Sequence, residues 1–240
     1  SPYIMKRRQD ASNKLSDTLD VSNADEYIFK KRQEGLKGFG MLHIFIAAYV
    51  RIISQRPALN RFIRGQKIYS RNCIEIMLTI KKEMKIESPD TVLKLFFPKD
   101  ATSDDVYRIL TDAIEESRKA ESEFDGLAKA LNYIPGLFLK FTVWLLNLLD
   151  YFGLVPRALT KLSPFHGSFA ITSMGSLGIP PVYHHLYDFG NIPVFCAFGA
   201  KYTKNELELD GTITQNKYVQ YTFTTDERIC DGHYFAAALK

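Results

Sequence analysis

Cysteine is scarce in this sequence, with three residues among 240, each within an apolar run. An odd number of scattered cysteines argues against a disulfide framework and is typical of a reducing compartment. No signal-peptide pattern opens the chain, where Ser1-Pro2-Tyr3 leads directly to the basic Lys6-Arg7-Arg8. These features together predict a cytoplasmic protein.

Several motifs of common enzyme classes are missing. The sequence has no Gly-rich phosphate loop, Cys-x-x-Cys, His-Glu-x-x-His or Gly-x-Ser-x-Gly. Their absence disfavours P-loop, dithiol, zinc-hydrolase and serine-hydrolase chemistry, and we expect no metal. Nor does one sign of charge dominate, because 31 Lys and Arg against 27 Asp and Glu give a net charge of +4, spread along the chain. A solvated surface explains this better than a nucleic-acid interface, so no nucleic-acid partner is expected.

A hydrophobic run long enough to cross a bilayer is lacking as well. Residues 131–156 are very apolar, but Lys140 and Asp150 interrupt them, and a span needs about 20 apolar residues. If 137–151 is helical, Lys140, Asn147 and Asp150 share one narrow face and the rest is hydrophobic. Such a helix either packs on the body or on a neighbouring subunit, or offers a surface to a membrane, a lipid or an acyl chain.

The remaining composition is that of a folded protein, with 46% hydrophobic and 13% aromatic residues, and its length suits one large domain over 1–240. An Asp210-Gly211 turn signal between two strand-like runs predicts a hairpin, which disfavours an all-parallel sheet. Periodicity and end signals predict helices over 3–14, 23–33, 41–55, 102–130 and 137–151, and strands over 18–21, 74–80, 91–97, 168–172, 194–198 and 218–224.

Two segments carry the functional argument. Residues 166–179 (HGSFAITSMGSLGI) resemble the Gly-Gly-Thr-Phe-Thr-Ile-Ser-Asn-Leu-Gly segment of dihydrolipoamide acyltransferases. Residues 225–232 (TDERICDG) resemble the Asp-His-Arg-x-x-Asp-Gly signature of that family and, in spacing, the His-x-x-x-Asp-Gly of chloramphenicol acetyltransferase. Residues 19–22 (LDVS), 57–60 (PALN) and 195–199 (FCAFG) match in order, so the resemblance covers nearly the whole chain apart from an apolar insert at about 131–160.

The resemblance implies a fold and an assembly. The fold would be an α/β two-layer sandwich, a mixed β-sheet with packed helices, as in chloramphenicol acetyltransferase. The family forms trimers with active sites between subunits, so a homotrimer is expected. Its members move an acyl group from a thioester to a small-molecule acceptor, and acyl-CoA, with coenzyme A as the carrier, is the expected donor here.

The resemblance also implies residue roles. A hydroxyl of the Thr-Ile-Ser segment, here Ser173, would donate a hydrogen bond to the oxyanion, which is worth about 3 kcal/mol. Thr172, next to Ser173, is a candidate substrate-binding residue. His166 precedes this strand and is a second candidate to contact substrate, with ordinary packing as the alternative. Asp231 would organise its loop by pairing with an N-terminal arginine, Arg7 or Arg8. His43, His184, His185 and His233 are better explained by packing or surface placement.

The departure from the family is Glu227, which occupies the position of the catalytic histidine. A free thiol has a pKa near 8.5 and a free glutamate about 4.3, so proton abstraction by an ordinary carboxylate is uphill by roughly 6 kcal/mol. Burial can close most of this gap. Glu227 is therefore either a desolvated base or a salt-bridge partner in a dead site. The protein is accordingly an acyltransferase with an altered active site, or an inactive trimeric scaffold or ligand-binding homologue.

Overall fold

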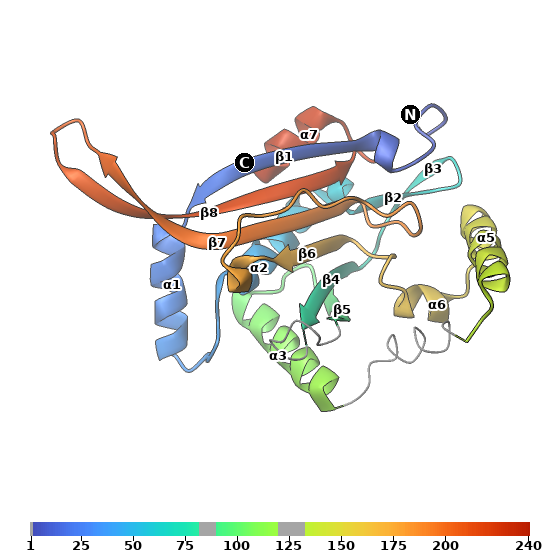
Figure 1. Cartoon of the computed structure of the whole chain (residues 1–240), viewed down its shortest axis with the longest axis horizontal. Coiled ribbons are helices and arrows are strands. Elements are labelled where there is room, and N and C mark those ends of the chain that lie inside the picture. The colour runs from blue at the N-terminus through green and yellow to red at the C-terminus, as the bar shows by residue number, and fades with distance from the viewer. Residues whose placement is uncertain (1, 82–89, 120–132) are drawn as a thin grey trace.

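The computed structural model describes residues 2–81, 90–119 and 133–240 (Figure 1). A six-stranded mixed sheet forms one layer, with the strand order β1-β8-β7-β6-β4-β5. Strand β6 is parallel to β4 and β7, and the other pairings are antiparallel. The strands are β1 (Ser12–Asp20), β4 (Ile74–Lys81), β5 (Asp90–Phe97), β6 (Phe169–Ser173), β7 (Val194–Leu207) and β8 (Ile213–Asp226).

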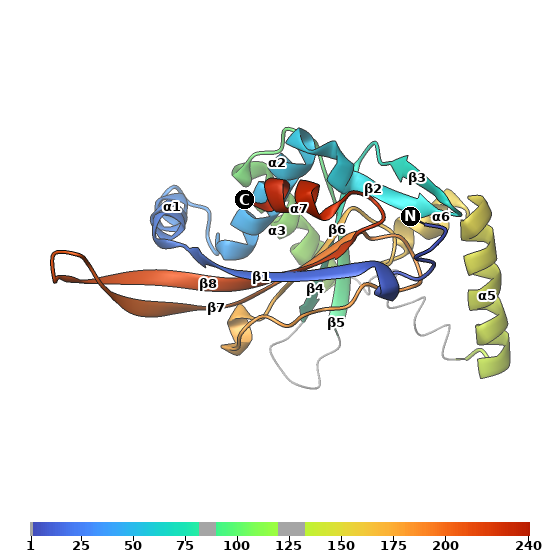
Figure 2. The ribbon, with the colours of Figure 1, turned by 90° about the horizontal axis from the view of Figure 1, so that it is seen from above.

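The second layer consists of helices that cover one face of this sheet (Figure 2). Within the described residues the helices are α1 (Ser22–Gln33), α2 (Met41–Gln55), α3 (Ser103–Lys119), α5 (Gly136–Phe152), α6 (Arg157–Leu162) and α7 (Gly232–Leu239). Helices α2, α3 and α7 pack over the centre of the sheet, and this confirms the predicted two-layer sandwich.

The core lies between α2 and the middle strands. One side of α2 is buried at Ile46, Tyr49, Val50 and Ile53, which are spaced three or four residues apart as a helix requires. Tyr49 stacks on Phe169 of β6 with 3.6 Å between ring centroids. Complete burial of each large apolar side chain contributes about 1.5–3 kcal/mol, so this contact fixes β6 beneath α2.

The loop between β6 and β7 covers the other face of the sheet. The hydroxyls of Thr222 and Thr224 on β8 donate hydrogen bonds to the carbonyls of Val182 and His184 in this loop. At Gly199 a Cβ would lie 2.8 Å from Pro181, so only glycine lets the loop cross β7 at that point. Gly199 is the last residue of the 195–199 motif, and the close approach of Pro181 explains why this motif ends in glycine.

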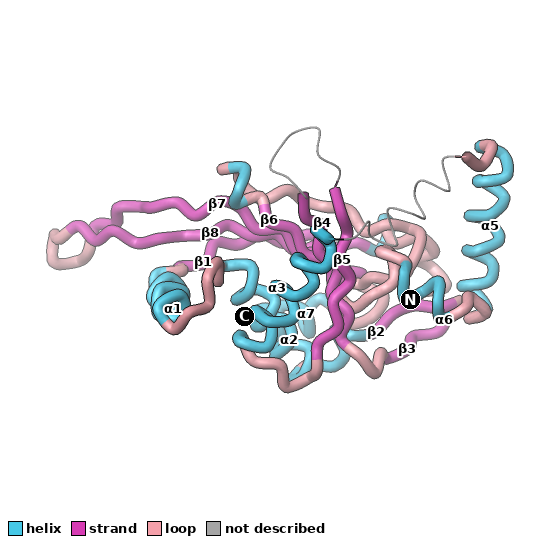
Figure 3. The backbone as a smooth tube through the Cα atoms, turned by 90° about the horizontal axis from the view of Figure 1, so that it is seen from below, coloured by secondary structure: helices cyan, strands magenta, loops and turns pink. Residues whose placement is uncertain are grey.

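Sequence predictions and structure differ mainly at the ends and in short elements. The helix predicted over 3–14 is wrong, because β1 starts at Ser12 and pairs with β8, leaving only a 3₁₀ turn at Gln9–Ala11. Strands β7 and β8 run well past their predicted ends, as an arm that leaves the sheet (Figure 3). The predicted helix 102–130 is observed as Ser103–Lys119, and its last part lies outside the described residues.

Several short elements have no counterpart among those predicted. Strands β2 (Arg61–Arg64) and β3 (Lys67–Ser70) form a hairpin around Gly65, whose φ of +59° suits a tight turn. Helix α6 follows Pro156 and is too short to give a periodic signal. Helix α5 agrees with its prediction to within one residue at each end. Within the described residues, no helix is long and apolar enough to cross a membrane.

Candidate functional site

Ser173 is the last residue of β6, at the edge where this strand leaves the sheet (Figure 1). Its side chain is half-buried, and its Oγ accepts a hydrogen bond from the Gly175 N–H at 3.3 Å. Among the described residues, its hydroxyl hydrogen has no acceptor. The hydroxyl is therefore able to donate to a ligand, as an oxyanion donor must.

A cleft of about 1080 Å³ opens at Ser173. Helices α1 and α2 form one wall, with Phe29 and Met41 exposing apolar atoms to it, and β7 and β8 form the other. Thr172 does not line this cleft, because adjacent residues of a strand point to opposite faces of the sheet. The structure thus separates two residues that were predicted to act together.

Charged side chains gather at one wall of the cleft. Asp25 of α1 accepts hydrogen bonds from Lys201 and from Lys217, the latter at 2.9 Å. Burial opposes the charge of Asp25, but the two lysines outweigh it and lower the pKa of the carboxyl group. The guanidinium of Arg32 also lines the cleft and donates to the Phe39 carbonyl at 2.7 Å. Three cationic groups and the carboxylates of Asp25 and Glu26 thus line the same cleft as Ser173.

His43 lies in the same cleft, at the start of α2. Its Nδ1 accepts a hydrogen bond from the Gly40 N–H at 3.0 Å, and the ring stacks on Phe39. A protonated imidazole cannot accept that bond, and burial lowers the pKa of His43. His43 therefore caps the helix as a neutral ring. This structural role agrees with the sequence analysis. The helical pattern of apolar residues did not predict that His43 lines the cleft.

The buried His43 predicts a pH dependence of stability. Because its folded-state pKa lies below the ordinary value of 6.5, the unfolded chain takes up the proton first as the pH falls. The free energy of unfolding should then decline from pH 7 towards pH 5, by at most about 1.4 kcal/mol per pH unit for one proton. Urea unfolding of His43→Gln, which keeps a cap at this position, should show a smaller decline. The exposed His233→Gln serves as the control, and an unchanged slope in His43→Gln would contradict the assignment.

Glu227 lies at the other end of the sheet, directly after β8. Its N–H donates to the Ala11 carbonyl at 2.9 Å, and its Oε2 accepts a hydrogen bond from Asn13 at 3.0 Å. The side chain is exposed, and among the described residues it forms no ion pair. In the single chain Glu227 is thus neither desolvated nor neutralised by a lysine or arginine.

The buried charges next to Glu227 belong to its neighbours. Asp226 and Arg228 form an ion pair at 2.7 Å, with side chains 2% and 6% exposed. Arg8 lies close by and donates to the carbonyls of Ile192, at 2.8 Å, and Gly190. Burial lowers the pKa of Arg8 to about 10, and the charge of Asp226 partly offsets this.

The predicted pairing of Asp231 with an N-terminal arginine is not formed. Asp231 is exposed and instead caps α7, accepting a hydrogen bond from the Tyr234 N–H at 2.8 Å. Capping satisfies a free N–H of the first helical turn. The carboxylate of this loop that forms a buried ion pair is Asp226, and its partner is Arg228 and not an N-terminal arginine.

His166 is buried at the start of β6, away from the Ser173 cleft. Its Nδ1 hydrogen-bonds to the Ser163 hydroxyl at 2.7 Å, and its Nε2 faces the Asp150 carboxylate at 3.7 Å. Burial opposes the charge of Asp150, but interactions with His166 and Arg64 outweigh it and lower the pKa of Asp150. In the single chain His166 is thus enclosed and cannot contact a ligand bound beside Ser173.

The register of the sheet fixes the distance between the two ends of the site. Ser173 pairs with Phe198 of β7, and Phe198 pairs with Tyr221 of β8. From Tyr221 the chain continues for six residues to Glu227, a rise of about 20 Å along an extended strand. Ser173 and Glu227 of one chain therefore cannot act on the same atom. A site that uses both must contain two chains.

Solved structures with the same architecture are known. A probable dihydrolipoamide acetyltransferase from Listeria monocytogenes is 15% identical, covers 99% of this chain and 86% of its own, and has a TM-score of 0.65. Chloramphenicol acetyltransferase is 11% identical, covers 98% and 88%, and has a TM-score of 0.56. The fold is that of these acyltransferases. This confirms the predicted resemblance at the level of the fold.

A third solved structure has the same fold. It is the Azotobacter vinelandii dihydrolipoamide acetyltransferase, studied for the roles of a serine, a histidine and an asparagine in its catalytic mechanism. It is 9% identical, covers 95% of this chain and 78% of its own, and has a TM-score of 0.61. No protein-family model and no curated protein matches the sequence.

Proposed function

We propose that this protein is an acyltransferase that moves an acyl group from a thioester to a small-molecule acceptor, at a site shared by two copies of the chain. The observation that carries the proposal is the opposed placement of Ser173 and Glu227. Each lies at an accessible end of the sheet, and each has a free hydrogen-bonding atom among the described residues. A head-to-tail ring of chains would bring the Ser173 end of one copy against the Glu227 end of the next. A homotrimer is the closed ring that we expect.

The spacing of polar residues supports the same assignment. In the Azotobacter vinelandii enzyme the histidine and the asparagine under study are four positions apart, as are Glu227 and Asp231 here. We assign the base to Glu227 and the oxyanion donor to Ser173 of the neighbouring copy. Asp231 acts indirectly, because it caps α7 and fixes the loop that follows Glu227.

Glu227 and Ser173 are sufficient for every proton transfer and hydrogen bond of the proposed acyl transfer. Glu227 takes the proton from the acceptor thiol or hydroxyl, which attacks the thioester carbonyl. The oxyanion that forms accepts a hydrogen bond from Ser173. Collapse of this intermediate breaks the C–S bond, and the departing thiolate recovers the proton from Glu227. The neighbouring copy would also exclude water from Glu227, and this desolvation is what a carboxylate base needs.

Coenzyme A is the carrier that suits the cleft at Ser173. Lys201, Lys217 and Arg32 outnumber the carboxylates of Asp25 and Glu26 in its lining, and this excess of positive charge would stabilise phosphate groups. The apolar wall formed by Phe29 and Met41 suits an acyl or pantetheine chain. We therefore propose acyl-CoA as the donor, with the cations at the phosphates and the thioester beside Ser173.

The test is release of CoA from a panel of short-chain and long-chain acyl-CoAs, with hydroxyl and thiol acceptors. Ser173→Ala should reduce turnover by about 10²–10³-fold, because the oxyanion loses a placed donor. Glu227→Gln should reduce it by about 10²–10⁴-fold, because an amide cannot take the proton. Ser70→Ala and Glu116→Gln, exposed residues outside both ends of the site, are the matched controls. Turnover that survives Glu227→Gln would refute the carboxylate base. Absence of turnover and of acyl-CoA binding in every form would leave an inactive trimeric scaffold.

A further inference from the structure

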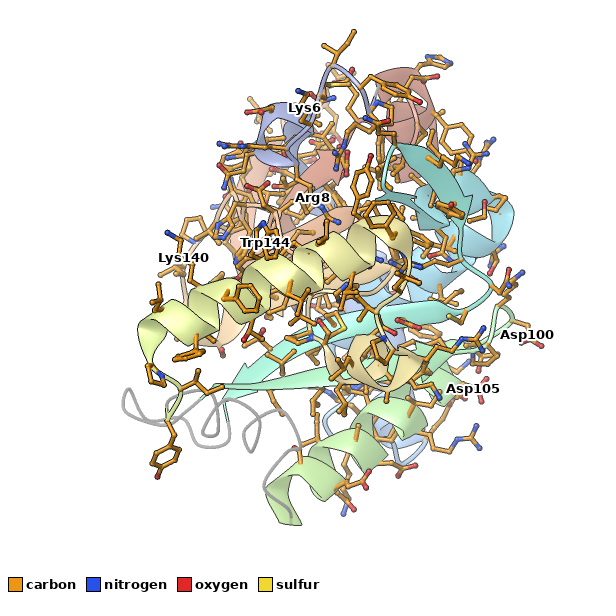
Figure 4. The ribbon with its side chains drawn as sticks, turned by 90° about the vertical axis from the view of Figure 1, so that its right-hand side faces the viewer. Lys6, Arg8, Asp100, Asp105, Lys140 and Trp144 are labelled. Carbon is orange, nitrogen blue, oxygen red and sulfur yellow. The ribbon has the colours of Figure 1, made fainter. Side chains whose placement is uncertain are left out.

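Helix α5 lies at one end of the molecule (Figure 1) and exposes a row of large apolar side chains on the face seen in Figure 4. Leu137, Phe141 and Trp144 are 80%, 58% and 56% exposed, although all three are apolar. At 100° per residue all the exposed apolar side chains of α5 except Val143 cover one continuous arc of the helix. The arc consists of Leu137, Phe138, Phe141, Trp144, Leu145, Leu148, Tyr151 and Phe152.

Helix α5 contacts the rest of the protein through polar side chains. An ordinary surface helix instead packs its apolar side against the core. The Asp150 carboxylate turns inward and forms an ion pair with Arg64 at 3.1 Å. Its other oxygen faces the buried His166. No side chain of α5 is fully buried. The polar contacts thus fix the rotation of the helix and hold the apolar arc outward.

Cations outnumber carboxylates around this arc, and Asp188 is the exposed acidic residue that lines the same pocket as Lys6. Between residues 133 and 187 the only acidic residue is Asp150, and its carboxylate is taken up by the inward ion pair. The cations of the same stretch, Lys140, Arg157 and Lys161, are exposed. Lys6 is exposed as well and lies near the end of α5, where it shares a pocket with Asn147 and Tyr151. Figure 4 shows Lys6 and Lys140 on the side of the molecule that α5 faces.

We propose that α5 docks on the surface of an anionic phospholipid bilayer, with its axis in the membrane plane. Helices that lie at this interface combine an aromatic and leucine-rich arc with lysine and arginine beside it. Phe, Trp and Tyr suit the headgroup boundary because their rings combine apolar area with, in Trp and Tyr, a polar edge. A single protruding helix is a convex ridge, which a fluid surface can surround on all sides. The neighbouring cations supply attraction to anionic lipid.

The sequence provides its own probe, because Trp144 is the only tryptophan of the chain. The full chain is mixed with vesicles of phosphatidylcholine alone, or of phosphatidylcholine with about one third phosphatidylglycerol. We expect co-flotation and a shift of tryptophan emission to shorter wavelength with the anionic vesicles. Both effects should weaken with neutral vesicles and at high salt, since surface charge attraction is screened. Flotation of Phe141→Glu/Trp144→Glu should fall by roughly tenfold or more, because two apolar side chains of the arc are lost.

The matched control places the same charges elsewhere. Leu209→Glu/Ile213→Glu changes two exposed apolar residues of the β7–β8 arm, at the opposite end of the molecule (Figure 3), and should float like the unmodified chain. Circular dichroism and gel filtration check that both variants keep their fold and assembly. If the tryptophan emission does not shift and the protein does not float when vesicles are added, the proposal is wrong. If emission instead shifts to longer wavelength on dilution of the protein alone, a second copy covers α5 and the membrane assignment fails. None of these measurements depends on acyl transfer, so they stand apart from the proposed function.

Discussion

Co-expression of Ser173→Ala and Glu227→Gln chains should restore activity that neither variant has alone. In a mixed ring an interface is intact when Ser173 comes from a Glu227→Gln chain and Glu227 comes from a Ser173→Ala chain. Random assembly in equal amounts makes about a quarter of the interfaces intact. The expected turnover of the co-expressed mixture, measured as CoA release per total chain without separation of its rings, is therefore about a quarter of that of the unmodified protein.

A second mixture separates the shared site from a site within one chain. The unmodified chain is combined in equal amounts with a chain that carries both substitutions. A shared site again leaves about a quarter of the activity, whereas a site within one chain would leave about half. A site within one chain would also give no activity in the first mixture. That pair of results would contradict the separation of about 20 Å along β8 that the strand register gives.

Removal of the Asp226 carboxylate should destabilise the protein strongly. Asp226→Ala is expected to lower the free energy of unfolding by about 3–5 kcal/mol, because Arg228 would keep a buried charge without its partner. Arg8 would at the same time lose the favourable interaction of its charge with Asp226. Urea unfolding followed by circular dichroism measures the change, and Asp226→Asn provides a milder variant if the alanine form does not fold.

An exposed ion pair of similar geometry provides the control. Arg108 and Asp105 on α3 are joined at 2.8 Å, close to the 2.7 Å of the buried pair, but the Arg108 side chain is 69% exposed. Arg108→Ala should cost no more than about 1 kcal/mol, since water screens such pairs. Equal losses for Arg108→Ala and Asp226→Ala would show that burial does not set the strength of the pair.

Local patterns predicted most of the regular elements. The helices at 41–55 and 137–151 agree with α2 and α5 because helical periodicity is a property of neighbouring residues. The ends of β7 and β8 were missed because a hairpin arm in water needs no buried face to keep its backbone paired. The segment 3–14 was assigned to a helix because pairing with β8, more than 200 residues away, leaves no local signal.

The sequence alone determined the order of the motifs, the serine at 173, the glutamate in place of histidine at 227 and the apolar character of 131–156. Only the tertiary structure decided how these parts relate. Strand pairing placed Ser173 and Glu227 at opposite ends of the sheet. Burial selected Asp226, not Asp231, as the ion-pair partner in that loop. The ion pair with Arg64 turned the polar side of α5 inward and left its aromatic residues in water. Each of these depends on contacts between distant residues, which spacing along the chain does not encode.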